Sequence, residues 1–333
     1  MLRVLPVLPA VGLLLVASPA QAQLAHGTMD VQWNEGAPDC ATSAPPPLQV
    51  HAYNPRTFIL RESLCATFEA PFMYLLVGST KALLIDTGDL ADPDRAPLAG
   101  TVLELLPRRG SARLPLLVVH THRHFDHRRG DAQFADLPGV QVVGYDLASI
   151  RRFYHFTAWP DGLGRIDLGD RIVDVIPTPG HNETEVSFYD RRTGLFFSGD
   201  FLSPARLLVD DADAYAASAA RVADFVRDRP VRFVLGGHIE MNAGGELFPW
   251  KSQYHPDEHV LQMTKADLLA LPAAISDFNG FYTRSGGFVL MNSIRILIAE
   301  GLAAGLALAG IVFAIVWYVR RRRRAPAPRG GGS

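Results

Sequence analysis

The sequence predicts an α/β fold of two β-sheets with helices on their outer faces, followed by a helix that crosses a membrane. Three observations support this prediction. From residue 56 on, short apolar and β-branched runs predict a strand-rich first part of the domain. Later, similar runs alternate with helical segments, a pattern typical of two sheets covered by helices. Near the C-terminus, residues 296–319 are apolar apart from Glu300.

Charge is distributed unevenly along the chain. The 333 residues carry a net charge of −2, and the seven arginines outside residues 23–319 contribute +7, so residues 23–319 carry −9. Because an acidic body is repelled by phosphate backbones, no nucleic-acid partner is expected. The hydrophobic content of 48% is sufficient for a sizeable core.

Residues 1–22 have the features of a secretory signal peptide. Arg3 precedes an apolar run that ends at Val16, and Ala20 and Ala22 form an A-x-A cleavage site. Since only one basic residue precedes the apolar run, an uncleaved N-terminal anchor is an alternative. The signal peptide predicts that the body of the protein is exported.

Residues 23–55 are rich in glycine, alanine and proline and are predicted to form an extended lead-in. This segment contains Cys40, and the second cysteine of the chain is Cys65. In an exported protein two cysteines are expected to form a disulfide. Two free, buried thiols are the alternative.

The predicted folded domain spans residues 56–260. Two apolar runs at 72–78 and 81–88 predict a hairpin. The remaining elements follow in chain order: a helix at 94–107, strands ending at 119 and 145 with a helix after the second, strands at 171–181, 185–190 and 195–200, a helix at 211–227 and a strand at 231–238. Residues 261–295 are predicted to be a helical juxtamembrane segment, in which Thr264 and Asp267 resemble a capping box that opens a helix to about Ala274.

Residues 296–319 are predicted to be a transmembrane helix. At about 1.5 Å per residue they reach roughly 36 Å, enough to cross a hydrocarbon core of about 30 Å. Arg320–Arg324 follow directly and predict that residues 320–333 form a basic cytoplasmic tail. The expected location is therefore the cell membrane, with a single span and a periplasmic domain. Gly301, Gly305 and Ala309 lie on one stripe of the helix, which suggests a homodimer through this segment.

Residues 120–130, HTHRHFDHRRG, place imidazoles and a carboxylate at the end of an apolar strand. His122 and His124 are two residues apart and project the same way if the chain there is extended. Asp126 and His127 follow directly. His120 lies on the strand itself, where packing with a hydrogen bond is expected rather than metal binding.

Three further candidates follow apolar strands in glycine-rich loops: His181, Asp200 and His238. Strand ends that meet at one edge of a sheet are where sites form in α/β folds. Imidazole and carboxylate ligands suit Zn²⁺, and the number of candidates suits two metal ions. A carboxylate that serves both ions would bridge them.

The stretch THRHFDH resembles the T-H-x-H-x-D-H signature of the metallo-β-lactamase superfamily, and the resemblance covers about residues 56–240. It implies an αββα sandwich, with Asp86 of LLIDTG near the metals. It implies two zinc ions per chain, with iron as an alternative. The implied ligands are His122, His124 and His181 for one ion and Asp126, His127 and His238 for the other, with Asp200 as the bridge.

The resemblance also implies an activity. A bridging hydroxide would attack a small ester, thioester or lactone, with Asp126 and Asp200 as catalytic residues and Asp126 orienting the attacking water. Asp200 makes the chain similar to glyoxalase II-like and lactonase-like members rather than to true β-lactamases. The alternatives are a phosphodiesterase, a mono-iron enzyme like the persulfide dioxygenases, and a non-enzymatic metal-binding or sensor protein.

Arg123, Arg128 and Arg129 lie within the motif, where the family usually has small or apolar residues and glycines after the Asp-His pair. These arginines either bind an anionic group of the substrate or pair with the excess carboxylates of the domain, and pairing is favoured. Residues 245–259 are either a lid over the site or a packed loop, and the packed loop is favoured.

The predicted topology can be tested with a reporter fused after Ser333. The arginines at 320–324 should hold the C-terminus in the cytoplasm, so an alkaline phosphatase fusion, which is active only in the periplasm, should be inactive there. A green fluorescent protein fusion at the same position serves as the matched control and should fluoresce. Activity of the phosphatase fusion would reverse the orientation.

Overall fold

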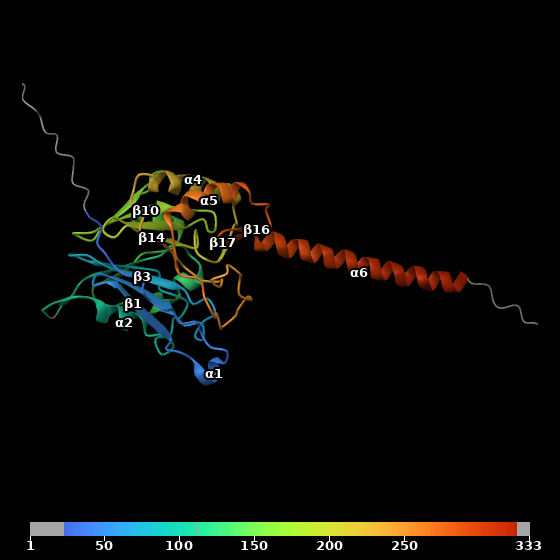
Figure 1. Ribbon diagram of the computed structural model, residues 1–333, viewed down its shortest axis with the longest axis horizontal. Helices are drawn as coiled ribbons and strands as arrows, with labels where there is room; N and C mark the ends of the chain where they lie inside the picture. Colours follow the sequence, from blue (N-terminus) through green and yellow to red (C-terminus); the bar gives the residue numbers. More distant parts are fainter. Residues whose placement is uncertain (1–22, 111, 325–333) are drawn as a thin grey trace, which may run out of the picture.

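Two six-stranded sheets lie face to face in the computed structural model, which describes residues 23–110 and 112–324 (Figure 1). The first sheet has the order β1 (Leu48–Asn54), β2 (Thr57–Glu62), β3 (Phe72–Val77), β4 (Ala82–Ile85), β7 (Leu116–Val119) and β8 (Val140–Val142). The second has the order β15 (Gln262–Met263), β14 (Phe233–Gly236), β12 (Leu195–Gly199), β11 (Val186–Asp190), β10 (Ile172–Pro177) and β9 (Gly164–Asp167).

Helices cover the outer face of each sheet. Residues of α2 (Leu98–Leu105) share a buried cluster with the first sheet, and residues of α4 (Ala212–Val226) and α5 (Lys265–Ser276) share one with the second. The layers therefore run helix, sheet, sheet, helix, and the predicted αββα sandwich is confirmed.

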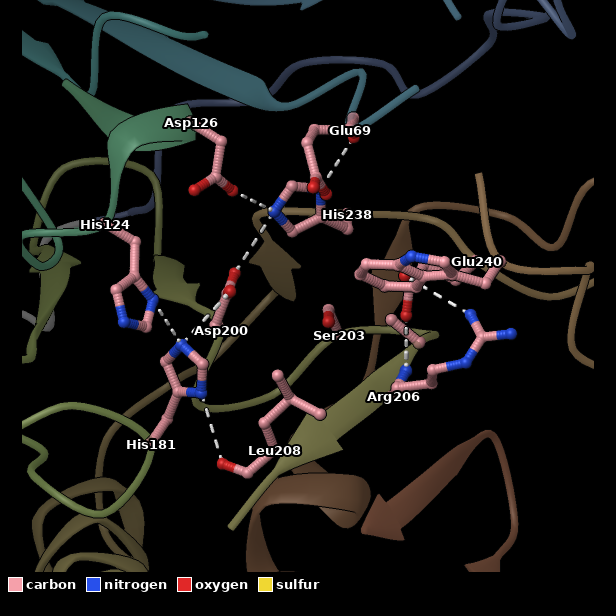
Figure 2. A pocket seen from close by; sticks show the side chains of 12 residues that line it. Glu69, His124, Asp126, His181, Asp200, Ser203, Arg206, Leu208, His238 and Glu240 are labelled. Atoms are coloured by element: carbon pink, nitrogen blue, oxygen red, sulfur yellow. Dashed lines mark hydrogen bonds and ion pairs between the residues drawn. The ribbon is translucent and has the colours of Figure 1, made fainter. Parts of the chain in front are cut away.

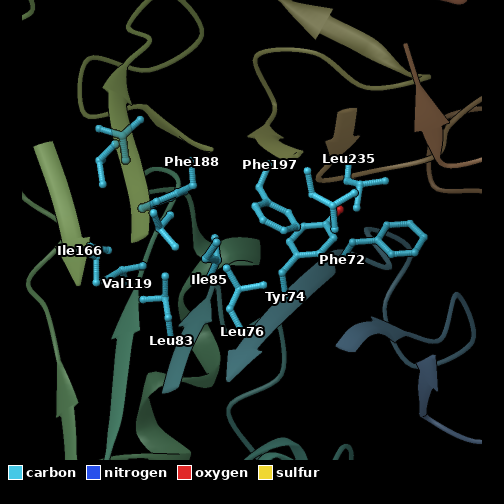
Figure 3. Close-up of a cluster of buried hydrophobic side chains, with 14 of the residues drawn as sticks. Phe72, Tyr74, Leu76, Leu83, Ile85, Val119, Ile166, Phe188, Phe197 and Leu235 are labelled. Atoms are coloured by element: carbon cyan, nitrogen blue, oxygen red, sulfur yellow. The ribbon is translucent and has the colours of Figure 1, made fainter. Parts of the chain in front are cut away.

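The inner strands of the two sheets contribute to two cores because neighbouring side chains point to opposite faces. Tyr74 and Leu76 of β3 pack between the sheets, while Leu75 packs outward against the α2 layer. Likewise, Phe197 of β12 packs between the sheets, and Phe196 packs outward against the layer of α4 and α5. Figure 3 shows the layer between the sheets, where side chains from both meet. Burial on both faces explains why these strands read as continuous apolar runs.

Several sequence predictions agree with the structure. The hairpin is β3 and β4, which pair antiparallel. The helix predicted at 211–227 is α4, for which Asp211 is the N-cap. Thr264 and Asp267 form the predicted capping box of α5, which runs to Ser276. Cys40 and Cys65 form the expected disulfide, which links the short helix α1 (Cys40–Ser43) to the loop after β2.

Other elements differ from the sequence predictions. The helix predicted at 94–107 is shorter, because Pro97 is its N-cap and α2 runs only from Leu98 to Leu105. β1 lies inside residues 23–55, where an extended lead-in was expected, and forms the edge of the first sheet. In the segment expected to be helical, α5 is followed by the hairpin of β16 (Tyr282–Ser285) and β17 (Phe288–Met291). β17 also pairs in parallel with β13 (Arg206–Leu208), which makes a third sheet.

The remaining short elements are β5 (Arg108–Arg109), β6 (Ala112–Arg113), the 3-10 helices at Phe125–His127 and Arg129–Gln133, and α3 (Leu147–Phe153). α6 (Ser293–Arg324) is the long C-terminal helix that extends away from the domain (Figure 1). Within the described residues its segment Ser293–Tyr318 is the one helix long and apolar enough to cross a membrane. The predicted signal peptide and residues 325–333 lie outside the described residues.

A buried ion pair joins the two sheets at one end of the sandwich. Nη2 of Arg171 lies 2.7 Å from Oδ2 of Asp190, and both side chains are 0% exposed. Arg171 also donates to the carbonyl of Arg56, in the turn between β1 and β2, and to the hydroxyl of Thr57 in β2 of the first sheet. One guanidinium therefore connects both layers.

Replacing this arginine should destabilise the domain strongly. Arg171→Met leaves Asp190 buried without its cationic partner, so the free energy of unfolding should fall by about 3–5 kcal/mol. Arg192→Met is the control, because Arg192 pairs with the exposed Asp170 and should contribute at most about 1 kcal/mol. Urea unfolding of the full chain in detergent measures both. Equal unfolding midpoints for the two variants would contradict the structural role of Arg171.

Candidate metal centre

The seven predicted ligands all lie just after the C-terminal ends of strands. His122, His124, Asp126 and His127 follow β7 in the first sheet. His181, Asp200 and His238 follow β10, β12 and β14 in the second sheet. The structure brings all seven together in two groups at one edge of the sandwich.

The first group consists of three imidazoles. Nε2 of His122 lies 2.9 Å from Nδ1 of His124, and Nε2 of His181 lies 3.0 Å from the same atom. Nitrogens bound tetrahedrally to one zinc at about 2.0–2.1 Å are roughly 3.3 Å apart. The three nitrogens therefore face a common point at close to the spacing of metal ligands.

The second group combines imidazoles and carboxylates. Oδ2 of Asp126 lies 3.2 Å from Nε2 of His127 and 3.2 Å from Nε2 of His238. The two imidazole nitrogens are 3.3 Å apart. Oδ1 of Asp200 completes the group at 3.4 Å from His127 and 3.5 Å from His238.

Asp200 lies between the two groups (Figure 2). Its Oδ1 faces the second group, while its Oδ2 lies 3.5 Å from Nε2 of His181 and 4.0 Å from Nε2 of His122. Oδ1 is buried and has no hydrogen-bond partner among the described residues. A buried carboxylate oxygen without a donor fits a site that receives a cation.

In three of the histidines, the ring nitrogen that faces away from the centre donates a hydrogen bond to an oxygen atom, which orients the ring. Nδ1 of His127 donates to Asp86, Nδ1 of His181 to the carbonyl of Leu208, and Nδ1 of His238 to the carbonyl of Glu69. Each bond fixes the tautomer, so the lone pair of Nε2 faces the centre. The fold thus supplies metal-ready nitrogens.

Asp86 is the main support of the motif loop. Its carboxylate also accepts from the backbone N–H and the hydroxyl of Thr121, at 2.7 and 2.9 Å. The residue has a φ of 64°, which asparagine and aspartate tolerate better than most residues. The expectation that Asp86 lies near the metal ligands is therefore met through His127. Sequence reasoning missed Asn182, whose Nδ2 lies 3.1 Å from Nε2 of His124.

Charge is unbalanced at the second group. Burial alone would lower the pKa of His127, but Asp126, Asp200 and Asp86 outweigh it and raise that pKa well above its usual range. The pKa of His238 rises to about 10 in spite of burial, chiefly through Asp200. In the first group, burial lowers the pKa of His124 to about 4. The carboxylates thus create a negative potential that a metal cation would compensate.

Gly237 lets the backbone pass close to two of the ligands, Asp200 and His127. A Cβ atom at this position would lie 2.5 Å from Oδ1 of Asp200 and 2.9 Å from Cε1 of His127. No side chain fits there without displacing both residues. The glycine before His238 is therefore a requirement of the ligand geometry.

A cavity of about 150 Å³ opens above the two groups. Sequence reasoning missed several residues of its wall, namely Glu69, Ser203, Arg206, Leu208, Glu240 and Trp250. No motif marks them, since they come from loops and from the short strand β13. Arg206 pairs with Glu240 at 3.3 Å, and burial raises the pKa of Glu69 to about 7.

Two of the three arginines of the motif pair with carboxylates, as the favoured interpretation expected, and Arg128 instead packs on aromatic rings. Arg123 pairs with Glu183 and Arg129 with Asp89, each at 2.6 Å. The Arg128 guanidinium lies over the rings of Phe125 and Tyr145, 4.6 and 3.9 Å from their centroids. His120 hydrogen-bonds Asp131 at 2.8 Å and belongs to neither ligand group.

The segment 245–259 is a packed loop. Glu258 forms a buried pair with Arg61 at 2.6 Å, and His255 stacks on Phe248 with ring centroids 4.1 Å apart. Trp250 is different, because it is 59% exposed and lines the cavity.

Comparisons with known proteins agree with this geometry. The model of the metallo-beta-lactamase superfamily matches residues 66–238. An acyl-coenzyme A thioesterase of Gallus gallus is 30% identical over 216 residues, which cover 55% of this chain and 77% of the relative. A hydroxyacylglutathione hydrolase of Anaeromyxobacter dehalogenans is 33% identical over 121 residues, 34% of this chain and 40% of the relative. Among solved structures, a metallo-beta-lactamase from Pontibacter korlensis aligns with a TM-score of 0.47 at 16% identity, covering 69% of this chain and 100% of its own.

The support from Asp86 can be tested by Asp86→Asn. The asparagine keeps the backbone conformation but removes the charge that orients His127, so metal affinity should fall about 10–100-fold. Competition with a chromophoric chelator measures the affinity.

Asp131→Asn is the matched control. It also removes the charge from an aspartate–histidine bond, but its partner His120 belongs to neither group, so affinity should stay unchanged. An equal loss in both variants would contradict the specific role of Asp86.

Proposed function

The chain belongs to the metallo-beta-lactamase superfamily, and on this premise we propose that it is a two-zinc hydrolase of small esters, thioesters or lactones. The broader statement, that the protein is a metallo-hydrolase, follows from the family and its relatives. The observation that carries the finer proposal is the position of Asp200, with one carboxylate oxygen facing each ligand group.

The donor set supports zinc. One ion would be held by His122, His124 and His181, the other by Asp126, His127 and His238, with Asp200 shared between them. Imidazole and carboxylate are ligands that zinc accepts readily, and the orphaned oxygen of Asp200 fits a shared cation. Iron accepts the same ligand types, so metal analysis is part of the test.

Bound metal ions would supply an activated water and would polarise the carbonyl oxygen of the substrate. The remaining tasks fall to the chain itself. Asp126 would orient the attacking water and hold its proton, because its carboxylate lies at the floor of the cavity between His127 and His238. Asp200 would fix the separation of the two ligand groups. The narrow cavity would limit access to the reacting group of the substrate and a few neighbouring atoms.

Two features support an acyl substrate over a phosphodiester. The relatives are named as hydrolases of acyl-coenzyme A and of hydroxyacylglutathione, both of which are acyl compounds. The charge of −9 on residues 23–319 opposes polyanions such as nucleic acids. The relatives also favour hydrolysis over the sensor and dioxygenase alternatives.

The helix α6 supports a proposed location in the cell membrane. Ser293–Tyr318 would span the cell membrane, with the arginines at 320–324 in the cytoplasm and the catalytic domain in the periplasm. The stripe of Gly301, Gly305 and Ala309 would allow two copies of the helix to associate.

The proposal is tested on the purified full chain in detergent. Elemental analysis should find about two zinc ions per chain, as two ligand groups require. Initial rates are then compared for small esters, thioesters and lactones, with bis(p-nitrophenyl) phosphate, oligonucleotides and a chromogenic β-lactam as competitors. The highest kcat/KM is expected for an acyl compound.

Asp200→Asn is the informative variant. It keeps the shape of the side chain but weakens the shared ligand, so zinc content should fall below two and kcat by about 100-fold or more, as for the loss of one strong electrostatic contact. Asp131→Asn again serves as the control and should retain both. Preferred turnover of a phosphodiester or a β-lactam would exclude the proposed substrate class, and full activity of Asp200→Asn would exclude the bridging role.

A further inference from the structure

The membrane helix begins directly at the edge of the folded domain. β17 ends at Met291 and α6 starts at Ser293, so only Asn292 lies between them. The apolar surface of the helix starts at once, with Ile294 61% and Leu297 67% exposed. Arg295 and Glu300 are the charged residues of its first two turns. Since a helix rises about 1.5 Å per residue, the hydrocarbon core then begins within about 12 Å of the domain, by Gly301.

The same strand pair reaches the metal centre. Leu208 of β13 lies opposite Met291 of β17, and neighbouring strands are about 4.8 Å apart. The carbonyl of Leu208 accepts the hydrogen bond from Nδ1 of His181, and the side chain of Leu208 lines the cavity (Figure 2). One strand therefore separates the cavity wall from the start of the membrane helix.

Exposed aromatic side chains surround this point. Phe281 is 47% and Tyr282 is 41% exposed. The carbonyl of Phe281 accepts from the N–H of Asn292, and Tyr282 lies opposite Met291, so both residues stand at the start of α6. Tyrosine and tryptophan rings are enriched where a protein meets the membrane–water interface, and Phe281 adds exposed apolar surface beside Tyr282.

The loop that carries Trp250 is connected to the β16–β17 hairpin. Arg284 of β16 donates to the carbonyl of Gly245 at 2.8 Å, which ties this loop to the β16–β17 hairpin. Trp250, at the cavity, is 59% exposed. Figure 1 shows α6 leaving the domain beside β16 and β17. We name the surface of Trp250, Phe281 and Tyr282 the interfacial surface.

The cavity is too small to enclose a long substrate. Its volume of about 150 Å³ is below the roughly 300–1,000 Å³ of pockets that enclose drug-sized ligands. A long hydrocarbon chain attached to the reacting group would therefore extend from the mouth, and an apolar chain exposed to water there is unfavourable.

We infer that the cavity opens onto the membrane at the interfacial surface and that the substrate is a membrane-borne acyl thioester or ester whose hydrocarbon chain stays in the bilayer. This inference rests on the proposed hydrolase function and names its substrate class. Water adds to the acyl carbon and the C–S or C–O bond breaks. The thiol or alcohol leaves with one proton from that water, and the acyl chain remains in the membrane as the carboxylic acid.

The position of the surface is tested without reference to activity. The two native cysteines are paired, so one introduced cysteine offers a single thiol for an environment-sensitive dye. Phe281→Cys and Trp250→Cys are labelled in the full chain reconstituted into phosphatidylcholine vesicles. Leu163→Cys is the control, because Leu163 is 51% exposed and lies before β9, at the opposite edge of the second sheet from β15.

Dyes at 281 and 250 should be quenched by lipids that are spin-labelled near the headgroup, and the dye at 163 should not. Emission at 281 and 250 that matches the control would overturn the inference, whatever the substrate of the enzyme is.

The substrate class is tested with two thioesters of one thiol, a butyryl thioester in solution and a palmitoyl thioester incorporated in the same vesicles. The double variant Phe281→Asp, Tyr282→Asp should lose about tenfold in kcat/KM on the palmitoyl substrate, since a penalty of ~1.4 kcal/mol corresponds to a factor of ten. It should retain the wild-type rate on the butyryl substrate, and Leu163→Asp should change neither rate.

The outcomes separate the two proposals. An equal loss on both substrates, or no loss on either, would overturn the inference while the proposed hydrolase function stands. Failure of the wild-type protein to hydrolyse either thioester, or any other ester or lactone, would contradict the proposed function, and the dye measurement would still decide whether the cavity faces the membrane.

Discussion

The carboxylate of Asp200 lies between two groups of imidazoles and directs one oxygen to each. The first group comes from the ends of β7 and β10, and the second from the ends of β7 and β14, so Asp200 at the end of β12 lies between ligands of both sheets. A buried oxygen without a hydrogen-bond donor is unfavourable unless a cation is present. The strand ends around Asp200 are therefore arranged as expected for a site that binds metal ions. Gly237 leaves the space that Asp200 and His127 occupy beside the backbone.

Backbone atoms carry much of the orientation of the site. His181 and His238 are held by main-chain carbonyls of Leu208 and Glu69, which lie on β13 and on the loop before β3. Because these acceptors are part of the polypeptide chain, the tautomers of the two rings depend on the path of the backbone rather than on any side chain. A displacement of the backbone at β13 would therefore change the orientation of the His181 ring.

The sequence allowed prediction of the ligands because each one stands in a short motif at the end of an apolar strand, as His181 does in PTPGH and Asp200 in FFSGD. The layers were also predictable, since β3 and β12 are apolar on both faces. The wall of the cavity was not. Arg206 and Trp250 reach the site through tertiary packing, and neither periodicity nor spacing marks such residues. The third sheet was missed for a similar reason: β13 and β17 are three and four residues long and lie about 80 residues apart, too short and too distant for a pairing signal.

The pairing of β13 with β17 also limits where the chain can be cleaved without disturbing the metal ligands. β17 is the last strand before the long apolar helix α6, yet it supports the strand whose Leu208 carbonyl orients His181. Asn292 adds a hydrogen bond from its amide to the carbonyl of Val209 at 2.7 Å. A water-soluble fragment released by proteolysis therefore has to retain the chain through Asn292. Cleavage anywhere between α5 and β17 would separate the domain from α6 and, in the same event, remove the strand that supports its metal centre.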